Sequence, residues 1–228
     1  MTALLAEGLD GNDISRFGYR SERWNFVEGE AMSGIIAKLN KEQNRYIIST
    51  VTSRVVWKTL VFYPGATLVR VTDLSWRPDG LTLFFFGLRG QYRRLDGSRR
   101  FIQYLNEKVP LKLNAGNVAD YLRFYSFFVH SGGRPFLLAE TTDDLGLFSA
   151  PLTDGQKNKI TQSLKPVTLQ GEDPEQGFIV TATVRYADSL FDCEFNVTPG
   201  GLVKMVRDKQ IEADLPELSG ELLAPAWG

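Results

Sequence analysis

The stretch NVADYLRFYSFFVHSGGRPFLLAE, residues 117–140, decides the expected fold. Its first half predicts a helix, because its apolar residues recur at the spacing of one helical face. The residues of this apolar stripe are Val118, Tyr121, Leu122, Tyr125, Phe128 and Val129. Asn114 or Asn117 is the expected N-cap, whose side chain accepts a bond from an orphan backbone N–H. The apolar run at 136–140 then predicts a buried strand.

The predicted helix is apolar on more than one face. Phe124 and Phe127 lie off the main stripe, and a helix of this kind is usually enclosed by other elements. Gly132 and Gly133 are expected to end the helix in a left-handed conformation, and Pro135 prevents its resumption. We therefore expect a core helix packed against a sheet.

Short runs rich in β-branched and aromatic residues predict strands on both sides of this helix. The expected strands are 46–51, 54–63, 67–76 and 81–86 before it, and 178–186, 190–198 and 202–207 after it. Further helices are expected at 30–40, 101–105 and 153–164, the last beginning with the capping-box spacing of Thr153 and Gln156. Residues 171–177 read as a polar turn. Because short turns join most of the strands, their pairing should be antiparallel.

The order of these elements predicts an α+β fold. We expect one or more curved antiparallel sheets wrapped on one central helix, with one or two peripheral helices. This outline is loosely cystatin-like, which is a likeness of outline alone, since no motif in the chain identifies a family. Residues 1–13 are expected to be a loose N-terminus, 14–212 a single domain and 213–228 a C-terminal tail. The alternative divides the domain into two sub-sheets, about 14–113 and 114–212.

Composition and charge exclude several classes of protein. The chain has 228 residues, of which 43% are hydrophobic and 23% charged, which is typical of a soluble globular protein. The formal net charge of −1 provides no general attraction to nucleic acid or to anionic membranes. No apolar run approaches the roughly 20 residues that span a bilayer, and the N-terminus lacks the pattern of a secretory signal. We expect a cytoplasmic protein with no nucleic-acid or membrane partner.

Metal and cofactor sites of familiar kinds find no support. The chain has one cysteine and one histidine, whereas a structural zinc site needs three or four such ligands. The adjacent Asp143 and Asp144 lack a calcium-loop pattern and are interpreted as a solvated turn. The glycine-rich phosphate-binding motifs are absent from the sequence. We expect no metal and no cofactor.

The only available cysteine–histidine pair is Cys193 and His130. Cys193 lies between Phe191 and Phe195 on the expected apolar face of a strand, where burial would make the thiol inert. His130 follows the last apolar residue of the central helix, where its ring can bond a terminal carbonyl. The nucleophile elbow of serine hydrolases is also absent from the sequence. We therefore assign no catalytic residue, and the sequence favours a protein that is not an enzyme.

Arginine is concentrated in one short segment, and arginine favours bidentate contact with carboxylates and phosphates. This segment contains Arg89, Arg93, Arg94, Arg99 and Arg100. It could form an anion or protein contact. The interpretation we prefer is an exposed connection whose charges pair with surface acids.

Two functions remain open. The first is a non-enzymatic binding or interaction protein, whose partner is another protein or a second copy of this chain. The second is a small-molecule-binding domain or enzyme with a pocket between the sheet and the central helix, since such pockets are mostly apolar with a few polar groups. The candidates for these polar groups are Tyr121, Arg123, Tyr125 and His130.

Overall fold

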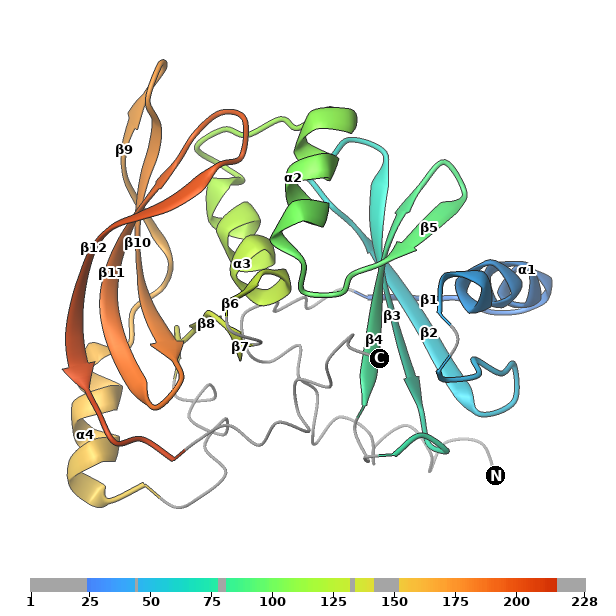
Figure 1. Cartoon of the computed structure of the whole chain (residues 1–228), viewed down its shortest axis with the longest axis horizontal. Helices are drawn as coiled ribbons and strands as arrows, with labels where there is room; N and C mark the ends of the chain where they lie inside the picture. Colours follow the sequence, from blue (N-terminus) through green and yellow to red (C-terminus); the bar gives the residue numbers. More distant parts are fainter. Residues whose placement is uncertain (1–23, 44, 78–80, 132–133, 142–151, 217–228) are drawn as a thin grey trace.

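The computed structural model describes residues 24–43, 45–77, 81–131, 134–141 and 152–216. Over these residues the protein is a mixed α+β structure with two antiparallel sheets (Figure 1). The N-terminal sheet has the strand order β1-β2-β3-β4-β5. Its strands are β1 (Asn25–Phe26), β2 (Ser53–Thr59), β3 (Ala66–Asp73), β4 (Thr82–Leu88) and β5 (Gln91–Arg94). The strands predicted at 67–76 and 81–86 correspond to β3 and β4, which pair as antiparallel neighbours.

The C-terminal sheet has the strand order β12-β11-β10-β8, and β9 also pairs with β10. Its strands are β8 (Leu137–Leu138), β9 (Thr168–Asp173), β10 (Gly177–Tyr186), β11 (Ser189–Val197) and β12 (Val203–Glu212). The antiparallel meander predicted after residue 178 is confirmed. Two short strands of two residues each, β6 (His130–Ser131) and β7 (Arg134–Pro135), pair with each other and belong to neither sheet.

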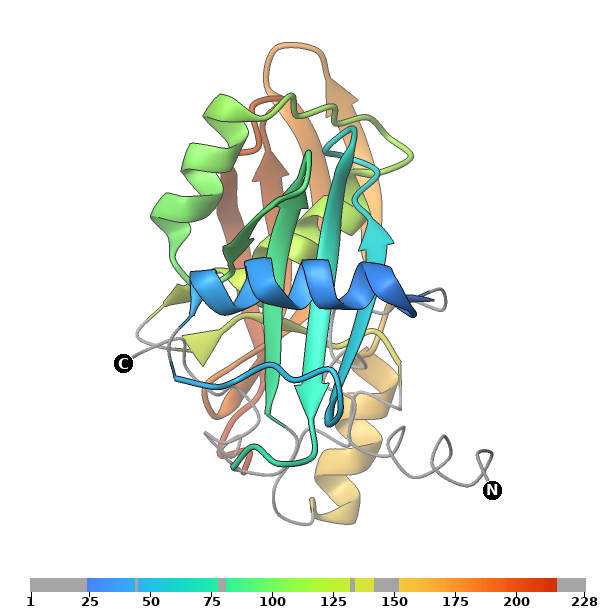
Figure 2. The same ribbon diagram turned by 90° about the vertical axis from the view of Figure 1, so that its right-hand side faces the viewer.

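Four α-helices occur among the described residues: α1 (Glu30–Leu39), α2 (Arg99–Lys108), α3 (Val118–Phe128) and α4 (Asp154–Ser163). α2 and α3 lie between the two sheets (Figure 1). α1 crosses the outer face of the N-terminal sheet (Figure 2), and its Ile36 and Leu39 pack into a second, smaller core there. The capping box predicted for α4 is present, with both Thr153–Gln156 bonds formed.

α3 is the predicted central helix, and it is buried on several faces. Its buried side chains are Val118, Tyr121, Leu122, Phe124, Ser126, Phe127 and Phe128. They join one hydrophobic core that takes side chains from β3 and β4 on one side and from β10 and β11 on the other. α3 needs two apolar faces because it contacts two sheets. This explains why phenylalanines lie off its main apolar stripe.

The strand predicted at 46–51 is wrong, because side chains take the place of ladder partners there. Asn40 donates to the Ile48 carbonyl at 2.8 Å and accepts from the Ile48 N–H at 2.9 Å. Gln43 bonds both backbone groups of Tyr46. Local side-chain bonds of this kind satisfy the backbone without a sheet. The segment is an irregular connection that joins the 3₁₀ turn after α1 to β2.

The ends of α3 also differ from prediction. Asn117 occupies the N-cap position but makes no side-chain cap bond. Its side chain bonds the backbone of Asn114 and Lys112 instead, at 2.9 and 2.8 Å. The helix ends at Phe128, before the two glycines, which lie outside the described residues. It ends there because Val129 is extended and the His130 N–H bonds the Gly97 carbonyl at 3.0 Å.

The segment 171–177 is not the polar turn that we predicted. Its first residues belong to β9, which pairs with β10 across a bulge at Ile179 and Val180. The side chains of β9 are almost all exposed, so the strand lacks the apolar alternation by which strands are recognised. The turn itself is confined to 174–176.

Candidate functional site

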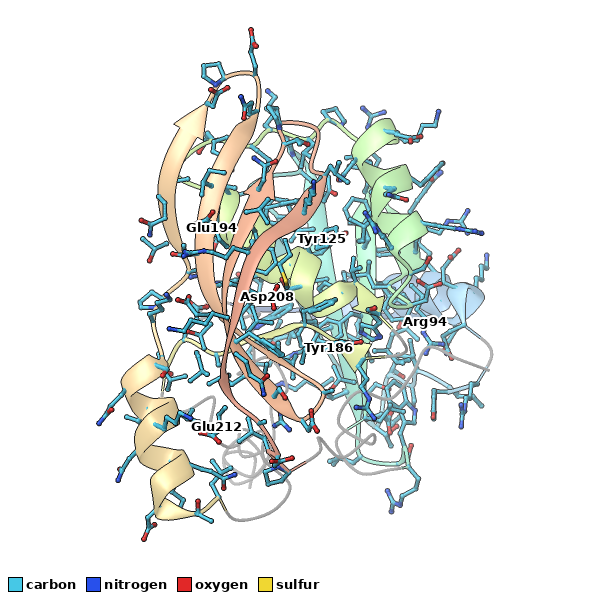
Figure 3. The ribbon with its side chains drawn as sticks, turned by 60° about the vertical axis from the view of Figure 1, so that its left-hand side comes forward. Arg94, Tyr125, Tyr186, Glu194, Asp208 and Glu212 are labelled. Atoms are coloured by element: carbon cyan, nitrogen blue, oxygen red, sulfur yellow. The ribbon has the colours of Figure 1, made fainter. Side chains whose placement is uncertain are left out.

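A pocket of about 250 Å³ lies between α3 and the inner face of the C-terminal sheet, with the beginning of α2 at its side. Its lining residues are Arg99, Tyr125, Ser126, Val129, His130, Ser131, Phe136, Phe195, Val203 and Met205. Figure 3 looks onto this side of the molecule and labels Tyr125 on α3 and Tyr186 on β10. The pocket therefore lies where the central helix and the sheet do not close completely against each other.

The wall of the pocket is mainly apolar. Phe195 on β11 and Val203 on β12 are buried members of the main core. Phe136 stacks on Tyr186, with ring centroids 4.7 Å apart and planes inclined by 16°. The Tyr186 hydroxyl in turn donates to the Ser131 carbonyl at 3.1 Å. These contacts hold the aromatic wall in place before any ligand binds.

Tyr125 and Arg99 are two polar residues of the pocket lining. Tyr125 lies on α3, and Arg99 is the first residue of α2. Burial raises the pKa of Tyr125 above its ordinary value, and Arg99 opposes this only in part, so the hydroxyl keeps its proton at neutral pH. Among the described residues no carboxylate forms an ion pair with Arg99. Arg99 is thus the charged residue among those that line the pocket at neutral pH.

His130 contributes a neutral ring. Burial lowers the pKa of His130 below the ordinary value, while the Phe127 backbone and the charge of Asp96 oppose the shift. Its Nδ1 is buried and has no hydrogen-bond partner among the described residues. That nitrogen lies against Gly97, where an added Cβ would come within 2.6 Å of it. The ring therefore packs on Gly97 and adds no positive charge at neutral pH.

Two of the four predicted pocket residues, Tyr121 and Arg123, point elsewhere. Arg123 lies in an ion pair with Glu140, at 2.7 Å for both contacts, and also contacts Asp120 at 2.8 Å. The hydrogen bond to Glu140 raises the pKa of Arg123 despite burial. Glu140 also accepts the Val167 N–H at 3.0 Å, so this pair joins α3 to the segment that leads into β9.

Tyr121 belongs to a buried network that joins four parts of the chain. Its hydroxyl donates to the Gly201 carbonyl at 2.7 Å and accepts from the Asn106 side-chain amide at 2.8 Å. Asn106 on α2 also accepts a bond from the Tyr63 hydroxyl and donates to the Gly201 carbonyl at 3.2 Å. Burial raises the pKa of both tyrosines. The network ties the turn between β11 and β12 to the two inner helices.

The arginine segment is more ordered than the connection that we predicted. Arg93 and Arg94 are in β5, and Arg99 and Arg100 form the start of α2. Arg89 has a positive φ of 49° at the turn between β4 and β5. Turn, strand and helix thus separate the five arginines. Arg93 pairs with Glu42 at 3.1 Å across a largely exposed contact, and such pairs add little stability.

No protein-family model, curated protein or solved structure matches this chain. Within the described residues, no group of three or more His, Cys, Asp or Glu side chains is placed to hold a metal ion. None of the described helices has the length and apolar character needed to cross a membrane.

β12 is the outer strand of the C-terminal sheet, and its sequence opposes pairing with another strand. Its pairing with β11 contains two irregularities, near Val206 and near Ile211. Most of its side chains are exposed, with Lys204 and Lys209 among them. Bulges and lysines are the devices by which natural sheets prevent edge-to-edge association. We therefore do not assign a protein contact to this edge.

Cys193 is buried on the inner face of the C-terminal sheet and is 1% exposed. Burial, with smaller contributions from Asp208 and Asp192, raises the pKa of its thiol to about 12. Cys193 is not one of the residues that line the pocket with His130.

We predict that a thiol reagent will modify Cys193 slowly in the native protein and rapidly after unfolding. The native rate should be lower on the order of a hundredfold or more, because the thiolate is the reactive form and is scarce in the fold. The measurement is the labelling rate with and without denaturant. Rapid native labelling that slows when His130 is replaced by Ala would instead support a cysteine–histidine dyad.

Proposed function

We propose that this protein is a non-enzymatic binding protein whose site is the pocket between α3, the start of α2 and the C-terminal sheet. The proposal rests on one observation: a mainly apolar hollow of about 250 Å³ whose lining also contains hydroxyl groups and one arginine. Ligand pockets have this composition, and those for drug-sized molecules are usually about 300–1,000 Å³. The ligand is accordingly a small, mainly apolar molecule.

The lining supports binding more than catalysis. Nucleophilic catalysis needs a nucleophile within hydrogen-bond reach of a base. Ser126 and Ser131 are the serines of the lining, but the Nδ1 of His130 lies against Gly97, which is not a lining residue. Cys193, the other nucleophile considered, is held as a thiol by burial. A small-molecule enzyme at this pocket is therefore the alternative that we do not prefer.

We also propose that residues 14–212 act as one domain, in which the two sheets wrap α3 in a loosely cystatin-like outline. Support comes from the main hydrophobic core, which joins side chains of both sheets to α2 and α3. A core shared in this way favours cooperative unfolding as a unit.

The single cysteine and its burial support a cytoplasmic location, where thiols stay reduced.

The test is a thermal-shift screen of small apolar acids, alcohols and amides, since a ligand that binds only the folded state raises its stability. At a ligand concentration about 100 times its Kd, the stabilisation should be about 2.7 kcal/mol. We expect Met205→Trp to abolish the shift by filling the pocket. Val206→Trp is the matched control, because the next residue of β12 is exposed and does not line the pocket.

Two outcomes would contradict the proposal. One is that no compound of the screen stabilises the wild-type protein. The other is that Met205→Trp responds to ligands as fully as Val206→Trp does, although the unliganded stabilities of both variants match that of the wild type.

A further inference from the structure

We propose that the ligand of this pocket carries a carboxylate, which the Arg99 guanidinium and the Tyr125 hydroxyl bind together. This inference rests on the proposed function and specifies the chemical class of the ligand. It predicts an amphipathic acid with a compact apolar body, such as an aromatic or branched-chain carboxylic acid.

The position of Arg99 in α2 is the first part of the argument. It is the first residue of the helix, and Arg100 follows it, with no acidic residue in the first turn. The positive end of a helix dipole disfavours cations. Asp96, the acid just before the helix, accepts the Ser98 N–H at 2.8 Å and does not form an ion pair with Arg99. An anion at this point would compensate both arginines.

The surroundings of Arg99 are the second part. Arg99 lines the pocket together with Tyr125, and no carboxylate of the described residues pairs with it. A guanidinium has five donors in a planar fork, which can serve a ligand in the pocket. An arginine that borders an apolar pocket in this way is suited to bidentate binding of a carboxylate.

The Tyr125 hydroxyl adds a second contact of the right polarity. Because burial raises the pKa of Tyr125, its hydroxyl retains a proton that it can donate. A hydroxyl both donates and accepts, so Tyr125 can bond one carboxylate oxygen while Arg99 bonds the other. The lining contains no aspartate or glutamate that would repel the anion.

The apolar residues of the lining indicate the chemistry of the other end of the ligand. Val129, Phe136, Phe195, Val203 and Met205 present only apolar side-chain atoms, apart from the methionine sulfur. Free inorganic anions would leave this wall without a partner, and a hydrocarbon would leave Arg99 without one. An amphipathic acid satisfies both, with its apolar body against the aromatic wall and its carboxylate at the start of α2.

The experiment uses matched pairs of probes that share the same apolar body and carry either a carboxylate or a neutral amide. Phenylacetate is compared with phenylacetamide, 4-methylpentanoate with 4-methylpentanamide, and indole-3-acetate with its amide, by calorimetric titration of the full chain. For at least one pair, the acid should bind roughly tenfold or more tightly than the amide, because hydrogen bonds to charged groups contribute about 1.5–3 kcal/mol. Added salt should weaken the binding of the acid and leave the binding of the amide unchanged.

The variants localise the effect. Arg99→Gln should remove the preference for the acid while preserving amide binding, and Tyr125→Phe should reduce that preference. Arg100→Gln is the matched control. Arg100 is the next residue of α2 but does not line the pocket, so this variant should keep the full preference for the acid. Arg99→Lys should retain part of it, because lysine keeps the charge without the planar fork.

The failures are distinguishable. If acids and amides bind the wild-type protein equally, or if Arg99→Gln and Arg100→Gln behave alike, the carboxylate inference is wrong and the pocket proposal stands. If no acid or amide binds and none stabilises the protein, both are wrong. Measuring the unliganded melting temperature of each variant separates lost binding from lost folding.

Discussion

Replacing Phe124 with alanine is expected to lower the free energy of unfolding by roughly 3–5 kcal/mol, the range for a large aromatic residue removed from a core. Phe124 is 0% exposed, and its ring lies 5.3 Å from that of Phe62 and 4.9 Å from that of Phe128. Its removal would therefore open a cavity between α3 and both neighbouring aromatic rings, which the surrounding core cannot fill completely. Urea denaturation monitored by tryptophan fluorescence measures the loss.

The control for this change is Tyr104→Ala. Tyr104 is an aromatic residue of α2, but it is 54% exposed, so its removal should cost well under about 1 kcal/mol. Similar losses for the two variants would contradict the placement of α3 in the core. A small loss for Phe124→Ala together with a large loss for Leu122→Ala would indicate a rotated helix.

The central helix could be predicted from sequence because its signal is local. Its apolar spacing and the alternation of Phe191, Cys193 and Phe195 on β11 are properties of a few consecutive residues. The segments that were mispredicted depend on contacts with other parts of the chain. Asn40 reaches Ile48 across eight residues, and β9 is a strand because β10 pairs with it, despite its polar sequence.

The candidate site was predictable only in part for the same reason. Tyr125 and His130 could be proposed because they are polar side chains on, or directly after, the helix that was expected to pack against the sheet. Tyr121 is one turn earlier on the same stripe, yet the turn at Gly201 covers it, 80 residues away in the chain. Arg99 stood out as part of a cluster of arginines. Its place beside Tyr125 in the pocket lining depends on how α2 packs beside α3, which no local pattern specifies.

The approach of that turn to α3 explains the second large effect that we expect. Gly201→Ala should lower the free energy of unfolding by roughly 2–4 kcal/mol, from a left-handed backbone and overpacking together. Gly201 has a φ of 78°, a conformation that costs a residue with a Cβ about 1–2 kcal/mol. An added Cβ would also lie 2.5 Å from the Asn106 amide nitrogen and 2.6 Å from the Tyr121 hydroxyl.

The expected loss arises because both neighbours bond the Gly201 carbonyl and cannot move without breaking the network. Gly200→Ala is the matched control. Its φ is not positive, and an added Cβ would meet nothing closer than the Thr198 hydroxyl at 3.9 Å, so its effect should stay within about 0.5 kcal/mol. Denaturant melts of the two variants measure the difference. Equal stabilities would mean that the turn between β11 and β12 does not pack on Asn106 and Tyr121 in solution.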